Sequence, residues 1–526
     1  MQIARIGDGS SEQYPADVVG GKAANLARMA ALGLPVPPAF VLPISLCAAT
    51  ARGDPAAVQS LADGLTEGIE FLENATARRF GDRRRPLLVS VRSGAARSMP
   101  GMLDTVLNVG CTSAAVRGLV RMTGHPRFAS DCRRRFLESY GNVVLGVRPE
   151  VFAGKCREVC AAEGVSSERA LDGESLERLA ASYEQLIEDE DHVLSEDPME
   201  QLRSSAEAVF SSWMSDRART YRKLERLEHL QGTAVTVQAM VFGNNGTSSG
   251  AGVAFSRDPS TGATKPVIDV LFESQGEDVV SGGHNPESEE AISRSLPEVA
   301  SQLRDALRRL EREFGDMQDV EFTIENGKLW ILQTRSAKRT PLAALRFAID
   351  FVNVGRITPA VALQQLDGLD LATLVNKRLV STEPPLAHGT PASSGIAIGR
   401  AAFDSQSAAR LAASGAPVIL LRPDTTTADV GGFAAAAGIV TTVGARTAHA
   451  ALVARQMAKP CIVGCTELAI DVAGYRARLG GIAITEGDWL SIDGEAGTIY
   501  RGESKVIAER PEAELAQVAR WRSQAA

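Results

Sequence analysis

His449 stands in a setting that suits the transfer of a phosphoryl group. The apolar, β-branched run 438–443 before it predicts a buried strand, and residues 447–457 are rich in helix-forming Ala, Leu, Arg and Gln. The histidine therefore falls in the first turn of a predicted helix, where free backbone N–H groups and the positive dipole end favour an anion. An imidazole there can accept a phosphoryl group and have its new charge stabilised. A histidine that merely begins a helix, without any chemistry, is the plainer alternative.

Two basic residues near the N-terminus are placed to contact phosphates. Lys22 follows two glycines and opens a predicted short helix, although the spacing is not that of a P-loop. Arg92 lies near the end of the predicted strand 86–94, beside small residues, where a guanidinium can fork onto phosphate oxygens. A surface lysine and a surface ion pair are the plainer interpretations of these two residues.

The clearest predicted hairpin turns at Asn326-Gly327, a strong turn signal. A two-residue loop would place Glu321 and Gln333 on opposite faces of the hairpin. A three-residue loop that includes Glu325 would place four polar side chains on one face: Asp319, Glu321, Gln333 and Arg335. Both registers leave an acceptable apolar face, but Mg²⁺ bound between ATP phosphates favours a carboxylate beside a carbonyl oxygen, which supports the three-residue loop.

The composition is that of a globular protein with several domains. The 526 residues favour about three compact units. A formal net charge of −8 argues against a nucleic-acid surface. No apolar run reaches the roughly 18 residues of a membrane span, and the N-terminus has no signal-peptide pattern. Seven scattered cysteines favour the reduced cytoplasm, and the pairs Cys156/Cys160 and Cys461/Cys465 are predicted to be buried thiols rather than zinc ligands.

The hydrophobic pattern changes period along the chain. Residues 125–230 are predicted to be mostly helical, and Asp197 followed by proline is typical of a helix N-cap. Alternation over 235–241 predicts a half-buried strand. Residues 341–385 predict a helical connector that leads into a turn-rich boundary. Beyond it, the pattern predicts strands near 396–404, 417–422 and 438–443, and a C-terminal helix that opens at Pro511-Glu512.

The residues around His449 resemble the phosphohistidine signature of the pyruvate, phosphate dikinase and phosphoenolpyruvate synthase family. That family carries a Thr-Ser-His-Ala-Ala run, and residues 447–451 here are Thr-Ala-His-Ala-Ala. Three positions depart from the pattern: Ala445 replaces Gly, Arg446 replaces Met and Ala448 replaces Ser. The resemblance implies that His449 is the phosphoryl carrier. It also raises Thr447 as a candidate for regulatory phosphorylation, beside the simpler role of a helix cap.

The remainder of the chain resembles the ATP-binding half of the dikinases. Gly-Gly-Lys-x-x-Asn-Leu at 20–26 implies that Lys22 contacts ATP phosphates, and the run after Arg92 gives that arginine a nucleotide role. The Asp-x-Glu-Phe-Thr-Ile and Leu-Gln-Thr-Arg runs match the end of the family's ATP-grasp domain. The resemblance implies Glu321 and Gln333 as Mg²⁺ ligands and a nucleotide site formed by Lys22, Arg92, Asp269, Glu277, Asp319, Glu321, Gln333 and Arg335.

Four further segments match or depart from the family in informative ways. The loop 99–105 resembles a phosphate-covering loop, and Arg97 is displaced by one position from the family's second arginine. One of the three arginines at 133–135 is expected to approach the nucleotide, and the sequence does not tell which. His284-Asn285-Pro286 takes the place of the family's Arg-Thr-Pro.

The resemblance implies an α/β and α+β multidomain fold. We expect an ATP-grasp nucleotide-binding domain over 1–340 with a helical insertion near 125–230, a helical connector over 341–385, a swivelling phosphohistidine domain over 386–505 and a C-terminal helix over 506–526. The implied enzyme is a pyruvate, phosphate dikinase-like phosphotransferase in which ATP, with phosphate, phosphorylates His449 and yields AMP and pyrophosphate. The family's pyruvate and phosphoenolpyruvate barrel would follow residue 526, and we expect it on a separate chain.

Two alternatives stay open beside this interpretation. The three changes next to His449 also suit a non-catalytic regulatory or carrier protein, and the final acceptor could be another small molecule. The expected partners are ATP, phosphate and Mg²⁺ together with a barrel-bearing chain, with no nucleic acid and no membrane. The expected location is cytoplasmic, and a homodimer is left open.

Overall fold

The computed structural model describes residues 3–9, 12–97, 99, 102–280, 285–381, 383–425, 429–446, 449–472 and 474–525. The chain divides into two compact units. The first comprises Met1–Thr247 and Trp330–Gln333, and the second comprises Ser248–Leu329 and Thr334–Ala526. Helices and strands alternate in both, which confirms the mixed α/β, multidomain class. The division falls inside the expected ATP-grasp range, so the boundary at residue 340 stays a prediction.

The first unit is built on a five-stranded sheet with the order β1-β2-β7-β5-β6. Its strands are β1 (Ala4–Ile6), β2 (Ala39–Leu42), β7 (Ala234–Ala239), β5 (Val89–Gly94) and β6 (Thr105–Val109), with a small pair β3 (Arg79–Phe80) and β4 (Pro86–Leu87). Its helices are α1 (Ala16–Val19), α2 (Gly21–Ala31), η1 (Ile44–Leu46), α3 (Cys47–Ala51), α4 (Pro55–Thr76), α5 (Ser113–Thr123), α6 (Pro126–Val143), α7 (Pro149–Ala162), η2 (Glu168–Ala170), α8 (Gly173–Asp189), α9 (Pro198–Ser212) and α10 (Asp216–Leu224).

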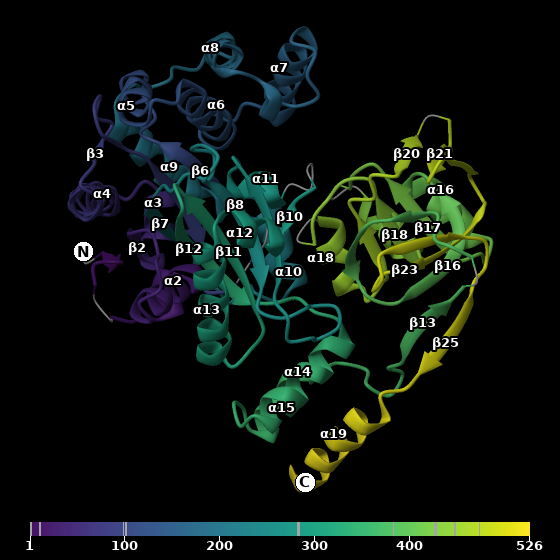
Figure 1. The fold of residues 1–526 in the computed structure, drawn as a ribbon. Helices are drawn as coiled ribbons and strands as arrows, with labels where there is room; N and C mark the ends of the chain where they lie inside the picture. Colours follow the sequence, from purple (N-terminus) through teal and green to yellow (C-terminus); the bar gives the residue numbers. More distant parts are fainter. Residues whose placement is uncertain are drawn as a thin grey trace. The chain divides into compact units, whose positions relative to one another are not determined.

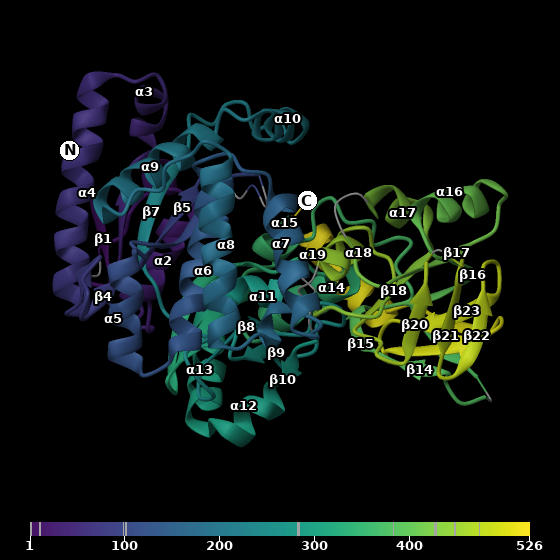
Figure 2. The ribbon, with the colours of Figure 1, turned by 90° about the horizontal axis from the view of Figure 1, so that it is seen from above.

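The helical prediction for 125–230 is confirmed by α6 to α10. Helices α6 and α8 pack side by side (Figure 2). The predicted cap is present as well, because the Asp197 carboxylate accepts hydrogen bonds from the N–H groups of Met199 and Glu200 at the start of α9.

Strand β7 is more buried than its alternating pattern indicates. All six of its residues are buried, including Thr236 and Gln238, so the prediction of a half-buried strand is wrong. Strand β7 lies between β2 and β5, and helices α1, α4 and α9 contact it. The Gln238 side chain is accommodated because it donates a hydrogen bond to the carbonyl of Pro37.

The second unit begins with a sheet of order β10-β9-β8-β11-β12. Its strands are β8 (Gly250–Phe255), β9 (Val267–Phe272), β10 (Glu287–Ser288), β11 (Gln318–Glu325) and β12 (Lys328–Ser336). The helices that follow β9 are α11 (Gly276–Val280), α12 (Glu289–Ser295) and α13 (Pro297–Phe314). We call this sheet the nucleotide-side sheet, since most of the predicted carboxylate positions lie on it.

An eight-stranded sheet carries the segment with His449. Its order is β14-β24-β23-β16-β17-β18-β19-β15, and β16 to β19 run parallel to one another. Its strands are β14 (Ala387–His388), β15 (Thr390–Ser393), β16 (Ile396–Ala402), β17 (Val418–Arg422), β18 (Gly438–Thr441), β19 (Cys461–Val463), β23 (Trp489–Asp493) and β24 (Thr498–Arg501). Helices α16 (Ser405–Ala413), α17 (Val430–Ala435) and α18 (His449–Gln456) connect the parallel strands, and β20 (Leu468–Asp471), β21 (Arg476–Leu479) and β22 (Ile482–Thr485) form a separate small sheet.

The connector and the C-terminal segment lie together in the second unit. Helices α14 (Pro341–Asn353) and α15 (Pro359–Gln365) pack on α19 (Glu512–Ala525), and β13 (Asn376–Val380) pairs with β25 (Lys505–Glu509) (Figure 1). The helices of the connector thus end at Gln365, and a strand follows them. The C-terminal helix predicted from Pro511-Glu512 is confirmed.

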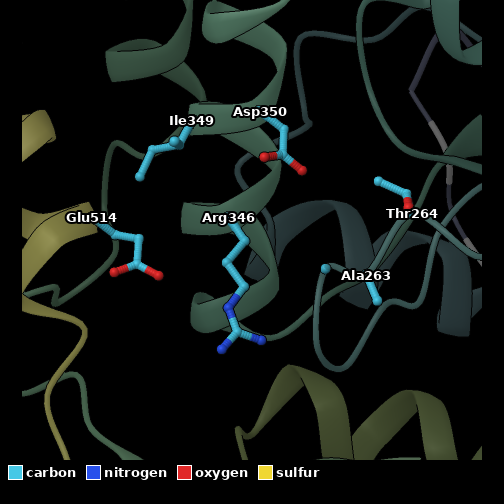
Figure 3. Close-up of a pocket in the computed structure, with 7 residues that line it drawn as sticks. Ala263, Thr264, Arg346, Ile349, Asp350 and Glu514 are labelled. Carbon is cyan, nitrogen blue, oxygen red and sulfur yellow. The ribbon is translucent and has the colours of Figure 1, made fainter.

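A small pocket lies where the loop at 262–264 approaches α14 and α19 (Figure 3). Arg346 and Asp350 face it from α14, and Glu514 faces it from α19. Arg346 donates a hydrogen bond to the carbonyl of Thr261, and Asp350 pairs with Arg257 at 2.9 Å. Both charged side chains therefore already have partners within the protein. We therefore assign no ligand to this pocket.

The described helices include none with the length and apolar character that crossing a bilayer requires. The cysteines are all free thiols. The burial predicted for the two spaced pairs is confirmed for Cys160, Cys461 and Cys465, whereas Cys156 is half-buried.

Candidate functional site

Lys22 and Arg92 come from two segments that meet in the first unit. The N–H of Gly21, at the start of α2, donates to the carbonyl of Ala95 just after β5. Gly20 makes this approach possible, because a Cβ atom there would lie 2.0 Å from the carbonyl oxygen of Gly94. Lys22 is exposed in the first turn of α2, and Arg92 is half-buried in β5. A helix start and a strand end with one basic residue each are suited to an anion.

The three arginines at 133–135 bind carboxylates of the first unit. Arg133 pairs with Glu184 and Glu196, each at 2.7 Å. Arg134 and Arg135 share a buried carboxylate, Asp131, at 2.8 and 2.9 Å. Asp131 also accepts a hydrogen bond from the side chain of Asn244 at 2.7 Å.

Asp131 is therefore expected to matter for stability. Burial acts to raise its pKa, but Arg135 and Arg134 outweigh burial and hold this pKa below its ordinary value. We expect Asp131→Asn to lower the free energy of unfolding by about 3 kcal/mol, because it removes the buried charge with which both Arg134 and Arg135 pair. Since the folded-state pKa is depressed, this contribution is present above the unfolded pKa of about 3.9 and is lost as the pH falls further.

Chemical denaturation at neutral and acid pH measures this effect. Glu138→Gln is the matched control, because Glu138 pairs with Arg134 but has a 43% exposed side chain. We expect that control to cost less than about 1 kcal/mol. Equal losses for the two variants would contradict the role given to Asp131.

Three carboxylates share one face of the nucleotide-side sheet. Val253 in β8 pairs with Asp269 in β9 on one side and with Glu321 in β11 on the other. Paired residues of antiparallel strands point to the same face, so Asp269 and Glu321 lie on one face, separated by a single strand. Asp319, two residues before Glu321, shares that face by alternation. The structure thus brings together predicted residues from two distant motifs.

The hairpin combines features of both registers that the sequence left open. Its turn is a plain two-residue loop, since Asn326 and Gly327 have φ values of 49° and 74°, which are typical of a type I′ turn. Continued regularly, that loop would place Asp319 and Arg335 on opposite faces. Their ion pair of 2.8 Å shows that the register has shifted by the time the strands reach them.

Burial along β12 locates this shift. Leu329 and Ile331 are buried in alternation, then Leu332 and Gln333 are both half-buried, and Thr334 is buried. Strand β11 pairs with β8 without a break in register from Asp319 to Ile324, so the extra residue lies in β12, as a bulge. The predicted three-residue loop is therefore wrong, while the shared face it implied for Asp319 and Arg335 is present.

Burial and ion pairing act against each other at these carboxylates. Burial raises the pKa of Asp319, and Arg335 opposes that rise. Burial likewise raises the pKa of Asp269, and Arg446 opposes it. One oxygen of Asp319, Oδ1, is buried without a hydrogen-bond partner among the described residues. Such an oxygen has a free lone pair for a ligand or a water molecule.

The oxygen donors on this hairpin suit Mg²⁺. Mg²⁺ at nucleotide sites takes one or two carboxylates and fills its other positions with phosphate oxygens and water. The half-buried Glu321, the amide of Gln333 and the unpartnered oxygen of Asp319 supply donors of that kind. Within the described ranges, no three His, Cys, Asp or Glu side chains gather closely enough to hold a metal ion by themselves.

The strand, turn and helix predicted around His449 are present. Strand β18 ends at Thr441, the described turn continues through Gly444 with φ of 130° to Arg446, and α18 begins at His449. The N–H of Gly444 donates to the side-chain oxygen of Asn285, and the N–H of Arg446 donates to a carboxylate oxygen of Asp269 at 2.8 Å. The turn before His449 thus rests on the face that carries the carboxylates.

Arg455 is a residue of this site that the sequence analysis missed. It lies in α18, is 2% exposed, and donates to the carbonyls of Ala392 and Arg446, both at 2.6 Å. Its guanidinium lies 5.4 Å from the ring of Phe255 in β8. Burial lowers the pKa of Arg455 to about 10. The available signal was a charged residue on the apolar, alanine-rich face of the predicted helix.

Some predicted residues are not tested by these contacts. Glu277 lies in α11 and is half-buried. Thr447, Ala448 and His284 lie outside the described residues, and so does part of the predicted phosphate-covering loop. For His449 the structure describes the backbone at the start of α18.

Comparisons with known families match both parts of this arrangement. The model of the pyruvate phosphate dikinase AMP/ATP-binding domain matches residues 57–296 and 284–346, which together span more than half of the chain. The model of the mobile domain of PEP-utilising enzymes matches residues 415–497, which include the His449 segment.

Curated relatives agree over nearly the whole chain. The sequence is 40% identical to pyruvate, phosphate dikinase of Rhizobium meliloti (strain 1021), over 98% of this chain and 59% of the relative. It is 40% identical to that of Clostridium symbiosum, over 93% and 56%, and 38% identical to the chloroplastic one of Flaveria pringlei, over 99% and 55%. The chain therefore spans somewhat more than half the length of the relatives it matches. On these matches and on the arrangement of its carboxylates and His449 turn, the chain belongs to the pyruvate, phosphate dikinase family.

Proposed function

We propose that this chain catalyses the ATP half-reaction of a pyruvate, phosphate dikinase. ATP and phosphate would react with His449 to give AMP, pyrophosphate and a phosphohistidine that carries the β-phosphoryl group. The observation that carries the proposal is the contact between the turn before His449 and Asp269, on the sheet face that also bears Asp319 and Glu321. The nucleophile-bearing helix and the predicted metal-ligand face approach each other in the second unit.

Each basic residue has a separate task in this proposal. Lys22 and Arg92 bind phosphate oxygens at the start of α2 and the end of β5. Arg335 contacts the transferred phosphate, and its ion pair with Asp319 holds the guanidinium in place. Asp269 and Glu277 complete the nucleotide site from β9 and α11. Such a site accelerates phosphoryl transfer mainly through positioning and charge neutralisation.

We propose Glu321 and Gln333 as the protein ligands of Mg²⁺. When bound, the ion neutralises charge on the ATP phosphates. The protein's own contribution is to hold a carboxylate and an amide oxygen on one hairpin, where the bulge in β12 sets the direction of the amide side chain. The half-exposed character of both side chains supports access by a nucleotide.

The names of the relatives are the basis for proposing pyruvate and phosphate as substrates. The names of the matched proteins contain both compounds, which supports phosphate as the second substrate and pyruvate as the final acceptor. We propose that the phosphoryl group passes between His449 and pyruvate or phosphoenolpyruvate.

Incubation of the purified chain with ATP, Mg²⁺ and phosphate tests the proposal. The expected products are AMP, pyrophosphate and a phosphoprotein that is labile in acid and stable in base. Omission of phosphate tests whether water replaces it. A regulatory or carrier protein without catalysis would form neither AMP nor phosphoprotein, and that result would overturn the proposed function.

A further inference from the structure

The turn before His449 is held by a residue to which the proposed function gives no role. Arg446 contacts Asp269 twice, through its N–H at 2.8 Å and through its guanidinium at 3.7 Å. Its Nε also donates to the carbonyl of Pro391 at 3.1 Å, in the adjacent β15 segment. Arg446 therefore joins the His449 turn both to its own sheet and to the nucleotide-side sheet.

We propose that Arg446 is a positioning residue. Through Asp269 it holds the His449 turn against the nucleotide-side sheet, and we call the arrangement with this contact formed the seated state. The carboxylate of Asp269 is 4% exposed, so its charge needs a partner while it is covered. Among the described residues, the cations that interact with it are Arg446 and the more distant Arg455. Both belong to the His449 segment, so both partners are present only while the turn is seated.

Asn285 strengthens the same seat. Its side-chain oxygen accepts the N–H of Gly444, and a Cβ atom at Gly464, just after β19, would lie 3.1 Å from that oxygen. The Asn285 amide thus fits between the turn and the end of the neighbouring strand. Arg446 adds a charged contact with Asp269 to this neutral contact.

The pair favours the seated state specifically. A conformational equilibrium shifts only through interactions that differ between its states, and the Arg446–Asp269 contact exists in one of them. When the turn leaves the sheet, both groups lose this contact. Replacement of Arg446 by methionine, the residue in the family pattern, would leave the buried carboxylate with a backbone donor and the distant Arg455.

A pair of spin labels measures seating without any reaction. Exposed Glu298 in α13 and Ala413 in α16 are changed to cysteine and labelled in the full chain, in a Cys156→Ser background that removes the half-buried native thiol. We expect a narrow distance distribution for the parent and a broader one for Arg446→Met, with the ratio of seated to unseated molecules lowered about fivefold. Arg446→Lys should restore part of the narrow component. Arg478→Met, which removes an exposed arginine of the small β20–β22 sheet, is the control.

A double-mutant cycle assigns the effect to the pair. If Arg446 acts through Asp269, the combination of Arg446→Met with Asp269→Asn loses no more seating than the more damaging single variant. Identical distance distributions for the parent and Arg446→Met would overturn the inference. So would fully additive losses in the cycle.

Catalysis provides the second readout, and this step rests on the proposed function. In a single turnover, AMP formation should slow about fivefold in Arg446→Met, while the affinity for ATP stays unchanged, because unseating removes the nucleophile and not the nucleotide site. Absence of AMP from the parent protein would contradict the proposed function and leave the spin-label result intact. A fall in ATP affinity equal to the fall in rate would instead contradict the positioning role.

Discussion

His449→Asn should abolish both AMP formation and phosphoprotein formation while ATP binding stays within about threefold of the parent. The expected loss of activity is at least about 1,000-fold, because asparagine offers no nucleophilic nitrogen in place of the imidazole. ATP affinity is expected to persist because Lys22, Arg92 and the hairpin carboxylates belong to other segments. A rapid-quench assay for AMP and equilibrium binding of ATP measure the two quantities separately.

His388→Asn is the matched control for this variant. His388 is exposed in β14 of the same eight-stranded sheet, so its replacement tests the general cost of losing a histidine there. We expect full activity for the control. If His449→Asn weakened ATP binding as much as it slowed AMP formation, the separation between nucleotide site and phosphoryl carrier would be wrong.

The local structure around His449 was predictable because each element has its own signal. The β-branched run gives β18, the helix formers give α18, and Lys459-Pro460 ends the helix before β19. These signals lie within a few residues of the elements they specify. The same holds for the Asn326-Gly327 turn, whose two positive φ values follow from its composition.

The bulge in β12 could not be predicted in this way. A shift of one residue reverses which side chains share a face, and the apolar pattern of the hairpin fits both registers. A three-residue loop, favoured because it suits Mg²⁺, predicts that Asp319 and Arg335 share one face of the hairpin. They do share a face, but the cause is a shift of register within β12 and not a longer loop. Burial of β7 was missed for a related cause, since the strands and helices that surround it come from distant segments.

The contact between Asp269 and Arg446 shows most clearly what local sequence signals cannot predict. Asp269 and Arg446 are 177 residues apart, and no periodicity or spacing connects them. The sequence comparison marked Arg446 only as a departure from the family, which suggested lost function. The contact with Asp269 gives that departure a structural use instead.

The last prediction concerns the hairpin ligands and separates metal binding from folding. Glu321→Ala and Gln333→Ala should each lower Mg²⁺-dependent AMP formation about 100-fold, because each removes an oxygen proposed to hold the ion against the phosphates. The free energy of unfolding should change by less than about 1 kcal/mol, since both side chains are only half-buried. Higher Mg²⁺ should recover part of the activity of either variant, because a weakened site is refilled by mass action.

Glu325→Ala is the matched control, a half-buried glutamate of the same strand placed at the turn. It should retain activity and respond to Mg²⁺ like the parent. If Glu321→Ala and Glu325→Ala had equal effects, general loss of negative charge on the hairpin would explain the result. If only Glu321→Ala lost activity and Gln333→Ala did not, the bulge in β12 would direct the amide away from the ion, and Asp319, with its unpartnered oxygen, would be the better second ligand.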